Sequence, residues 1–302
     1  MIQRVALAAV ALATAACTGT PSPPPTSGTS APTVPTSGRA DVGGYELAYE
    51  CHGEGSPTVI LEAGLGGAGT DQFFSFMDRI GDDARVCTYD RAGTGASDLR
   101  PADTGTVTAG LMARELHALL GAIAVEPPVI LIGFSYGGMP VRAYEGEYPD
   151  EVAGMVLLDA SSEPEVPIYE RLHAGPWIDD TDRIDIHATV RELHAAGDLG
   201  DLPLIVVTAG QIEDRWLATV PRLAAKAQVR LAGLSSDADQ VVAPDSGHFV
   251  FEDDPDVVVT AIRSVLDAAR SDAALPDCVT AFEETDALCV KPGDVPKLEP
   301  AA

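Results

Sequence analysis

The stretch that decides the fold is Val129-Ile130-Leu131-Ile132-Gly133-Phe134-Ser135-Tyr136-Gly137-Gly138. Its first six residues are largely apolar, which is typical of a strand buried on both faces of a sheet. The spacing Gly-x-Ser-x-Gly follows at once, and residues 139–148 favour a helix. Small residues on both sides of a serine permit a sharp strand-to-helix turn that lifts the serine Oγ clear of the sheet. The stretch therefore predicts an exposed and chemically available Ser135.

Strands and helices alternate on both sides of this stretch. Short apolar or alternating runs predict further strands at 45–52, 58–62, 85–89, 155–158, 204–208 and 241–243. Helical spacing of apolar residues predicts helices at 111–123 and 257–269. This alternation favours an α/β fold, a mostly parallel sheet of about eight strands with helices on both faces. The expected domain covers 40–270, followed by a C-terminal extension at 271–302.

The first residues of the chain predict export. Arg4 precedes an apolar run at 5–16, which is too short to cross a bilayer as a helix and is typical of a signal peptide at 1–16. Residues 17–39 are rich in Thr, Ser, Pro and Gly. Such a composition cannot bury enough apolar surface to fold, so this segment is expected to be a disordered linker.

Cys17 follows the small residues Ala15 and Ala16 directly. This arrangement resembles a bacterial lipoprotein signal, in which the cysteine becomes the acylated first residue of the mature chain. Thr14 stands where such signals usually carry Leu. We therefore expect a cell-surface lipoprotein anchored to the membrane through Cys17, with cleavage to a free secreted protein as the alternative.

The charge of the chain excludes several partners. Lys and Arg total 19 against 46 Asp and Glu, which gives a formal net charge of −27. A surface of this sign repels polyanions, so nucleic acid and anionic membrane surfaces are not expected as partners. The only membrane contact expected is the lipid anchor, and the sequence predicts no particular oligomeric state.

Four cysteines besides Cys17 are an even number in an exported chain, which predicts two disulfides. Cys278 and Cys289 lie close together in the C-terminal tail and are expected to pair there. Cys51 and Cys87 lie in two predicted strands, so their pairing depends on the fold. No Cys or His spacing typical of a metal site is present in the sequence.

A second reactive side chain comes late in the chain, at His248 in Ser246-Gly247-His248, after the last predicted strand. A serine in a strand-to-helix turn followed much later by a histidine is the chain order of one class of serine hydrolase. Two further motifs lie between strands and helices, Glu62-Ala63-Gly64-Leu65-Gly66-Gly67 and Tyr89-Asp90-Arg91-Ala92-Gly93-Thr94-Gly95. With these four motifs in this order, residues 40–270 resemble an α/β-hydrolase-fold serine hydrolase of the esterase or lipase type.

The resemblance implies acyl transfer on a small-molecule ester without a cofactor. Ser135 would be the nucleophile and His248 its base, and the backbone N–H groups of Leu65 and Tyr136 would form the oxyanion hole. The acid that orients His248 would be Glu213 or the adjacent Asp214, after the seventh strand. Some members of the family take this acid from the end of the sixth strand, where Asp159 is the alternative.

The resemblance has two further implications. The family inserts a small helical lid after the sixth strand, here at 160–202. Its second and fourth strands are neighbours, which would bring Cys51 and Cys87 together.

Two other functions are consistent with parts of the sequence. Gly64, Gly66 and Gly69 match the G-x-G-x-x-G of a dinucleotide-binding fingerprint, with Asp90 about 20 residues further along. An NAD-binding oxidoreductase would, however, leave Ser135 and His248 without a role. A non-catalytic ligand-binding protein on the same fold is the other alternative, because fold alone does not determine function.

Overall fold

The computed structural model describes residues 37–167, 184–212 and 220–300. Contacts divide the chain into residues 1–33 and 34–302, and every described residue lies in the second unit. The expected signal peptide, Cys17 and most of the expected linker lie outside the described residues. Among the helices that the structure describes, none combines the length and the apolar character needed to span a membrane.

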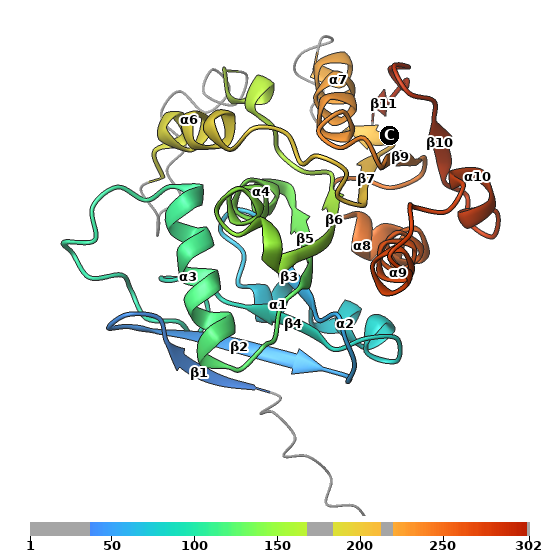
Figure 1. Ribbon diagram of the computed structural model, residues 1–302. Coiled ribbons are helices and arrows are strands. Elements are labelled where there is room, and N and C mark those ends of the chain that lie inside the picture. The colour runs from blue at the N-terminus through green and yellow to red at the C-terminus, as the bar shows by residue number, and fades with distance from the viewer. Residues whose placement is uncertain (1–36, 168–183, 213–219, 301–302) are drawn as a thin grey trace, which may run out of the picture. The chain divides into compact units, whose positions relative to one another are not determined.

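A nine-stranded sheet runs through this unit in the order β1-β2-β4-β3-β5-β6-β7-β9-β10 (Figure 1). The strands from β4 to β9 in this order are parallel, and β1, β2 and β10 run antiparallel to their neighbours. The two remaining strands, β8 and β11, form a separate two-stranded sheet. The bounds are β1 Ser37–Asp41, β2 Glu46–His52, β3 Val59–Glu62, β4 Val86–Tyr89, β5 Val129–Phe134, β6 Val152–Leu158, β7 Leu204–Ala209, β8 Gln211–Ile212, β9 Ala238–Ala243, β10 Leu288–Val290 and β11 Glu299–Pro300.

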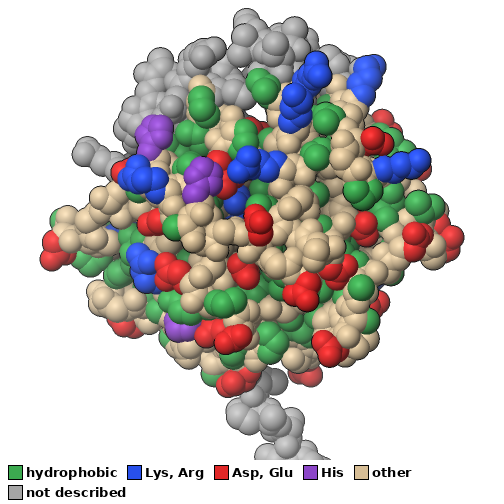
Figure 2. All heavy atoms as spheres, turned by 45° about the horizontal axis from the view of Figure 1, so that its top comes forward, with side chains coloured by type: hydrophobic (Ala, Val, Ile, Leu, Met, Phe, Trp, Pro, Cys, Tyr) green, Lys and Arg blue, Asp and Glu red, His purple; other side chains and the backbone are tan. Residues whose placement is uncertain are grey.

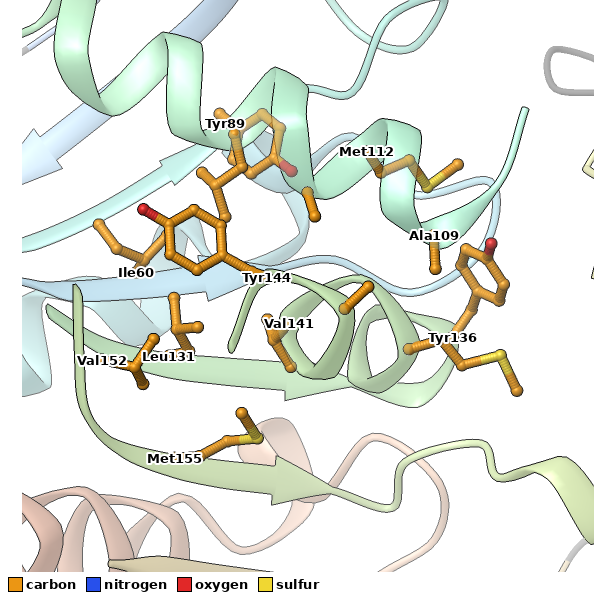
Figure 3. Packing of buried hydrophobic residues seen from close by; sticks show 14 of the residues in the cluster. Ile60, Tyr89, Ala109, Met112, Leu131, Tyr136, Val141, Tyr144, Val152 and Met155 are labelled. Atoms are coloured by element: carbon orange, nitrogen blue, oxygen red, sulfur yellow. The ribbon is translucent and has the colours of Figure 1, made fainter. Parts of the chain in front are cut away.

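Helices cover both faces of the large sheet, so its central strands are buried on both sides. One face carries α3 Ala109–Ala122, α4 Gly138–Glu147, α6 Ile186–Ala196 and α7 Val220–Ala232, and the other carries α2 Phe74–Gly81, α8 Val250–Asp253 and α9 Pro255–Ser271. Figure 3 shows the first of these cores, in which Leu131 of β5 and Met155 of β6 face Val141 of α4. The short helices are α1 Gly69–Gln72, α10 Cys278–Ala281 and the 3₁₀ turns η1 Ser135–Gly137, η2 Pro149–Glu151 and η3 Glu163–Glu165.

The structure differs from the predicted boundaries at both ends of the domain. Strand β1 begins at Ser37, inside the expected linker, and is the edge strand that pairs antiparallel with β2. Strand β10 pairs with β9 and carries part of the expected extension at 271–302 into the sheet. Both strands are short and lie at the edges of the sheet. Strand β1 forms a hairpin with β2, the next strand along the chain, whereas β10 pairs with β9, which lies far from it in the sequence.

Both expected disulfides are present. Cys51 and Cys87 lie opposite each other on the neighbouring strands β2 and β4, with their Cα atoms 4.1 Å apart. Cys278 of α10 is bonded to Cys289 of β10, with a Cα separation of 6.1 Å. The second disulfide holds the C-terminal segment against the edge of the sheet to which β10 belongs.

Candidate active site

Ser135 occupies a strained turn between β5 and α4. Its φ is +52°, in the left-handed region that non-glycine residues rarely adopt. The turn is packed so closely that glycine is needed on both sides. A Cβ on Gly133 would lie 2.7 Å from Gly138 Cα, and one on Gly137 would lie 2.4 Å from the carbonyl oxygen of Glu62. The tight turn therefore requires glycine at both positions of the Gly-x-Ser-x-Gly spacing, because a side chain there would collide with the backbone.

His248 connects Ser135 to a carboxylate. The imidazole Nε2 lies 3.0 Å from Ser135 Oγ, and Nδ1 lies 2.7 Å from Asp159 Oδ2. His248 comes from the loop between β9 and α8, and its ring packs 4.8 Å from that of Phe134 at the end of β5. Three side chains from distant parts of the sequence therefore form one hydrogen-bonded relay, in which the histidine can accept a proton from the serine.

Asp159 holds the position for which Glu213 or Asp214 was the first prediction. It follows β6 directly, its φ is +38°, and its backbone N–H donates to the carbonyl of Val207 at 2.7 Å. Its Oδ1 accepts a hydrogen bond from the N–H of Ala209 at 3.1 Å, which leaves Oδ2 for His248.

The sheet register accounts for the position of Asp159, the alternative acid of the sequence prediction. Leu158 of β6 pairs with Val207 of β7, so the residue that follows β6 lies beside the end of β7 and reaches His248. Because Asp159 already accepts from Nδ1, that nitrogen has no second proton to donate to another acid. Glu213 and Asp214 lie outside the described residues.

The loop after β3, which carries Leu65, passes close to the serine at Gly64. A Cβ added to Gly64 would lie 3.0 Å from the ring of Phe134 and 3.4 Å from the Cβ of Ser135, so the loop packs closely on the end of β5 and is adjacent to the serine. The N–H of Leu65 donates to no acceptor among the described residues. Tyr136, the second predicted donor, lies in η1 immediately after Ser135, and its side chain is fully buried.

A buried ionic cluster lies beneath this loop, and the sequence patterns did not assign it a role. Arg91 is 1% exposed and Glu62 is fully buried, and Arg91 Nη1 lies 2.7 Å from Glu62 Oε1. The hydroxyl of Tyr89 donates to the other oxygen of Glu62. Burial raises the pKa of Glu62, while the charge of Arg91 opposes that shift. Both motifs that contain these residues are visible in the sequence, but their contact depends on the pairing of β3 with β4.

Glu165 is a second acid that the patterns did not assign. It ends η3, and its Oε2 accepts from the backbone N–H of Ser162 at 2.8 Å and from the Ser162 hydroxyl at 3.1 Å. Burial, assisted by the negative charge of Asp159, raises its pKa to about 8, although the bonds from Ser162 and the charge of His248 act in the opposite direction. The signal in the sequence is the Ser-x-x-Glu spacing of a capping box.

Replacing Glu165 by glutamine is expected to stabilise the folded chain increasingly as the pH rises. The pKa is about 8 in the folded chain against an ordinary 4.5, so between these values the folded state keeps a proton that the unfolded state has lost. The free energy of unfolding of the parent therefore falls with rising pH in this window. Glutamine does not titrate, so the difference between variant and parent should grow by on the order of 3 to 5 kcal/mol between pH 4 and pH 8.

Urea denaturation at a series of pH values measures this difference. A constant difference across the window would show that Glu165 does not titrate there.

The glycines of the dinucleotide fingerprint have a different role in the structure. The helix that follows them, α1, has four residues, and a Cβ on Gly69 would lie 2.1 Å from the carbonyl oxygen of Tyr89. Asp90 holds the neighbouring loops together: Oδ1 accepts from the N–H of Thr70 at 3.0 Å, and Oδ2 accepts from the N–H of Ala96 at 2.8 Å. These residues close the loops around β3 and β4, and the carboxylate expected for a ribose is already engaged.

Comparison with known proteins agrees with this architecture. A family model described as the alpha/beta hydrolase fold matches residues 57–194. A thermophilic esterase from Thermogutta terrifontis superposes with a TM-score of 0.57 at 22% identity, over 77% of this chain and 98% of that chain. The chain has the α/β-hydrolase fold. A serine hydrolase involved in carbazole degradation superposes on this α/β-hydrolase fold with a TM-score of 0.56 at 20% identity, over 76% of this chain and 98% of that chain.

Several known proteins are also similar to this chain in sequence. The uncharacterized protein YqjL of Bacillus subtilis is 28% identical over 229 residues, which are 74% of this chain and 88% of YqjL. A proline iminopeptidase of Clostridium botulinum is 30% identical over 129 residues, which are 42% of each protein. The match to the iminopeptidase thus spans less than half of its length.

No group of three or more His, Cys, Asp or Glu side chains suited to a metal ion occurs among the described residues. His52 lies between Glu50 and Asp78, and His117 stacks on Tyr148 with the ring centroids 4.1 Å apart. These two histidines therefore have local contacts separate from the relay of His248.

Proposed function

We propose that this protein is an exported serine hydrolase that cleaves a small-molecule ester through an acyl-enzyme on Ser135. The observation that carries the proposal is the hydrogen-bonded relay from Ser135 Oγ to His248 Nε2 and from Nδ1 to Asp159. A serine hydroxyl is a weak nucleophile until a base removes its proton, and this relay supplies the base and a carboxylate that orients it.

The reaction begins when His248 Nε2 takes the proton of Ser135 as Oγ attacks the ester carbonyl carbon. Asp159 accepts from Nδ1–H, holds the imidazole in the required tautomer and stabilises the imidazolium that forms. The bond between the carbonyl carbon and the alcohol oxygen then breaks, and the departing oxygen takes the proton from Nε2. Water attacks the acyl group by the same sequence, releases the acid and returns the proton to Ser135.

The negative charge that develops on the carbonyl oxygen is stabilised by the N–H groups of Leu65 and Tyr136. The support for Leu65 is that it follows Gly64, which packs close to Ser135, and that its N–H has no acceptor among the described residues. The support for Tyr136 is its position directly after Ser135, at the start of the helical segment that continues into α4. Donors arranged in advance stabilise the transition state without the cost of reorganisation.

The charge of the chain limits the substrate. The sequence carries a net charge of −27, and Figure 2 shows acidic side chains scattered over the face that it presents. Such a surface favours neutral or cationic esters over anionic ones as they approach Ser135. The name of the Thermogutta protein, an esterase, agrees with an ester as the substrate.

A series of p-nitrophenyl esters of rising acyl length tests the proposal, with Ser135→Ala as the control. We expect hydrolysis by the parent and labelling of Ser135 by a fluorophosphonate. A parent that is no faster than its control, and that no fluorophosphonate labels, would instead favour a ligand-binding protein on this fold.

We further propose that the protein is a membrane-anchored lipoprotein acylated at Cys17. The support is the sequence alone: one basic residue, an apolar run at 5–16 and small residues directly before the cysteine. We expect radiolabelled palmitate to enter the parent expressed in a bacterial host and to be absent from Cys17→Ser. A parent without label that appears in the medium would contradict the anchor and favour secretion.

A further inference from the structure

We infer that Arg91 is a positioning residue that fixes the oxyanion loop, defined here as residues 62–67. The inference rests on the proposed function and assigns a role in it to the buried cluster beneath the loop. Arg91 donates from Nη1 to the carbonyl oxygen of Ala63 at 2.7 Å and from Nη2 to that of Gly64 at 2.6 Å. Together with its bond to Glu62, one guanidinium thus holds three successive residues of the loop.

The contact of Arg91 with Gly64 helps to set where the N–H of Leu65 points, together with a longer bond of 3.4 Å from the N–H of Gly67 to the same carbonyl. The carbonyl of Gly64 and the N–H of Leu65 belong to one peptide unit, which is planar and trans, so the two groups point in opposite directions. Because Arg91 holds the carbonyl oxygen, the N–H is directed away from Arg91. A Cβ added to Gly64 would lie 3.4 Å from the Cβ of Ser135, so the peptide that Arg91 holds belongs to a loop segment that passes close to the nucleophile.

The charge of Arg91, like its position, favours hydrogen-bond donation by the N–H of Leu65. A cation bonded to a peptide carbonyl polarises the peptide, which makes its N–H a stronger donor. The guanidinium carbon also lies 5.9 Å from the ring centroid of Tyr136, the residue that carries the second donor. One buried cation therefore bonds the peptide of the first predicted donor and lies near the side chain of the residue that carries the second.

The cluster is not arranged for stability alone. Burying a charged pair costs desolvation energy that its attraction often does not recover. Arg91 Nε is buried and has no hydrogen-bond partner among the described residues, which adds a further cost. Because the ion pair carries these costs, we attribute its presence to the fixed position that it gives to the oxyanion loop and not to a gain in stability.

Two variants and one matched control test the inference. Arg91→Met alone would leave the charge of Glu62 buried and unpaired, so it is combined with Glu62→Gln. Arg91→Lys keeps the charge but lacks the fork that reaches two carbonyls at once. Tyr89→Phe is the control, because it removes a buried hydrogen bond to Glu62 and leaves the carbonyl contacts of Arg91 intact.

We expect kcat per active site, with sites counted by fluorophosphonate titration, to fall about 10- to 100-fold in the double variant, with KM within about 3-fold of the parent. Arg91→Lys should lie between the double variant and the parent, and Tyr89→Phe within about 3-fold of the parent. A trifluoromethyl ketone forms a tetrahedral adduct with an oxyanion, so its affinity should fall by the same factor as kcat. A role in folding alone would lower the number of titrated sites but not kcat per site.

The inference would be overturned by an unchanged kcat per site in the double variant, or by an equal loss in Tyr89→Phe. If the double variant does not fold, Arg91→Lys is the deciding variant. The inference then requires that its kcat per site and its affinity for the ketone fall together, and it fails if they do not. A parent without ester hydrolysis would instead contradict the proposed function itself.

Discussion

Replacing Ser135 by alanine is expected to lower kcat for the best p-nitrophenyl ester by about 10⁴- to 10⁶-fold. The variant retains His248, Asp159 and the predicted oxyanion donors but has no oxygen to attack the carbonyl. Residual catalysis would come only from binding and from stabilisation of an oxyanion formed by direct attack of water. Initial rates over a range of substrate concentrations, compared with those of the parent, measure the loss.

The matched control for this experiment is Ser264→Ala. Ser264 lies in α9, on the far side of the sheet from α4, and its Oγ bonds the carbonyl of Thr260 one turn earlier. Its kcat is expected to stay within about 2-fold of the parent, because a substitution away from the site acts mainly on stability. Equal activity of Ser135→Ala and the parent would contradict the assigned nucleophile.

Replacing Asp159 by asparagine is expected to lower kcat by about 10⁴-fold while the chain remains folded. The carboxylate accepts from Nδ1 of His248 and from the N–H of Ala209 at the same time. An asparagine has one oxygen instead of two, so it cannot serve both donors equally, and its amide group favours the wrong imidazole tautomer. The measurement is kcat against pH, with circular dichroism to show that the fold is retained.

Glu213→Gln and Asp214→Asn are the controls for the acid, and each is expected to keep kcat within about 3-fold of the parent. These two residues were the first prediction for the acid, so the comparison is direct. If either control lost orders of magnitude while Asp159→Asn kept its activity, the acid after the seventh strand would be restored.

The local patterns predicted most of the elements but not the acid. The apolar run at 129–134 and the glycines around Ser135 determine a buried strand and a sharp turn whatever surrounds them, because both depend on neighbours in the chain. His248 could be predicted because it lies in a loop after the last parallel strand, where the chain order places the base. The acid, in contrast, had two acceptable positions, since the ends of β6 and β7 lie side by side in the sheet.

Local patterns also could not predict the ionic cluster of Glu62, Tyr89 and Arg91, because it depends on which strands are neighbours in the sheet. Its residues come from two motifs that are separated by the helices α1 and α2 in the sequence and meet only because β3 and β4 are neighbours. The pairing of Cys51 with Cys87 also needed the strand order, which came from a resemblance and not from spacing.

Local patterns were enough to predict the α/β class, the buried strands, the strained turn at Ser135 and the order of serine before histidine. These features depend on periodicity, on glycine sterics and on chain order, all of which are local or one-dimensional. Three features become visible only in the folded chain: Asp159 bonds His248, β10 joins the sheet, and Arg91 holds the carbonyls of Ala63 and Gly64. Those contacts join residues far apart in the chain, and strand order and register, which bring such residues together, are set by the packing of the whole sheet.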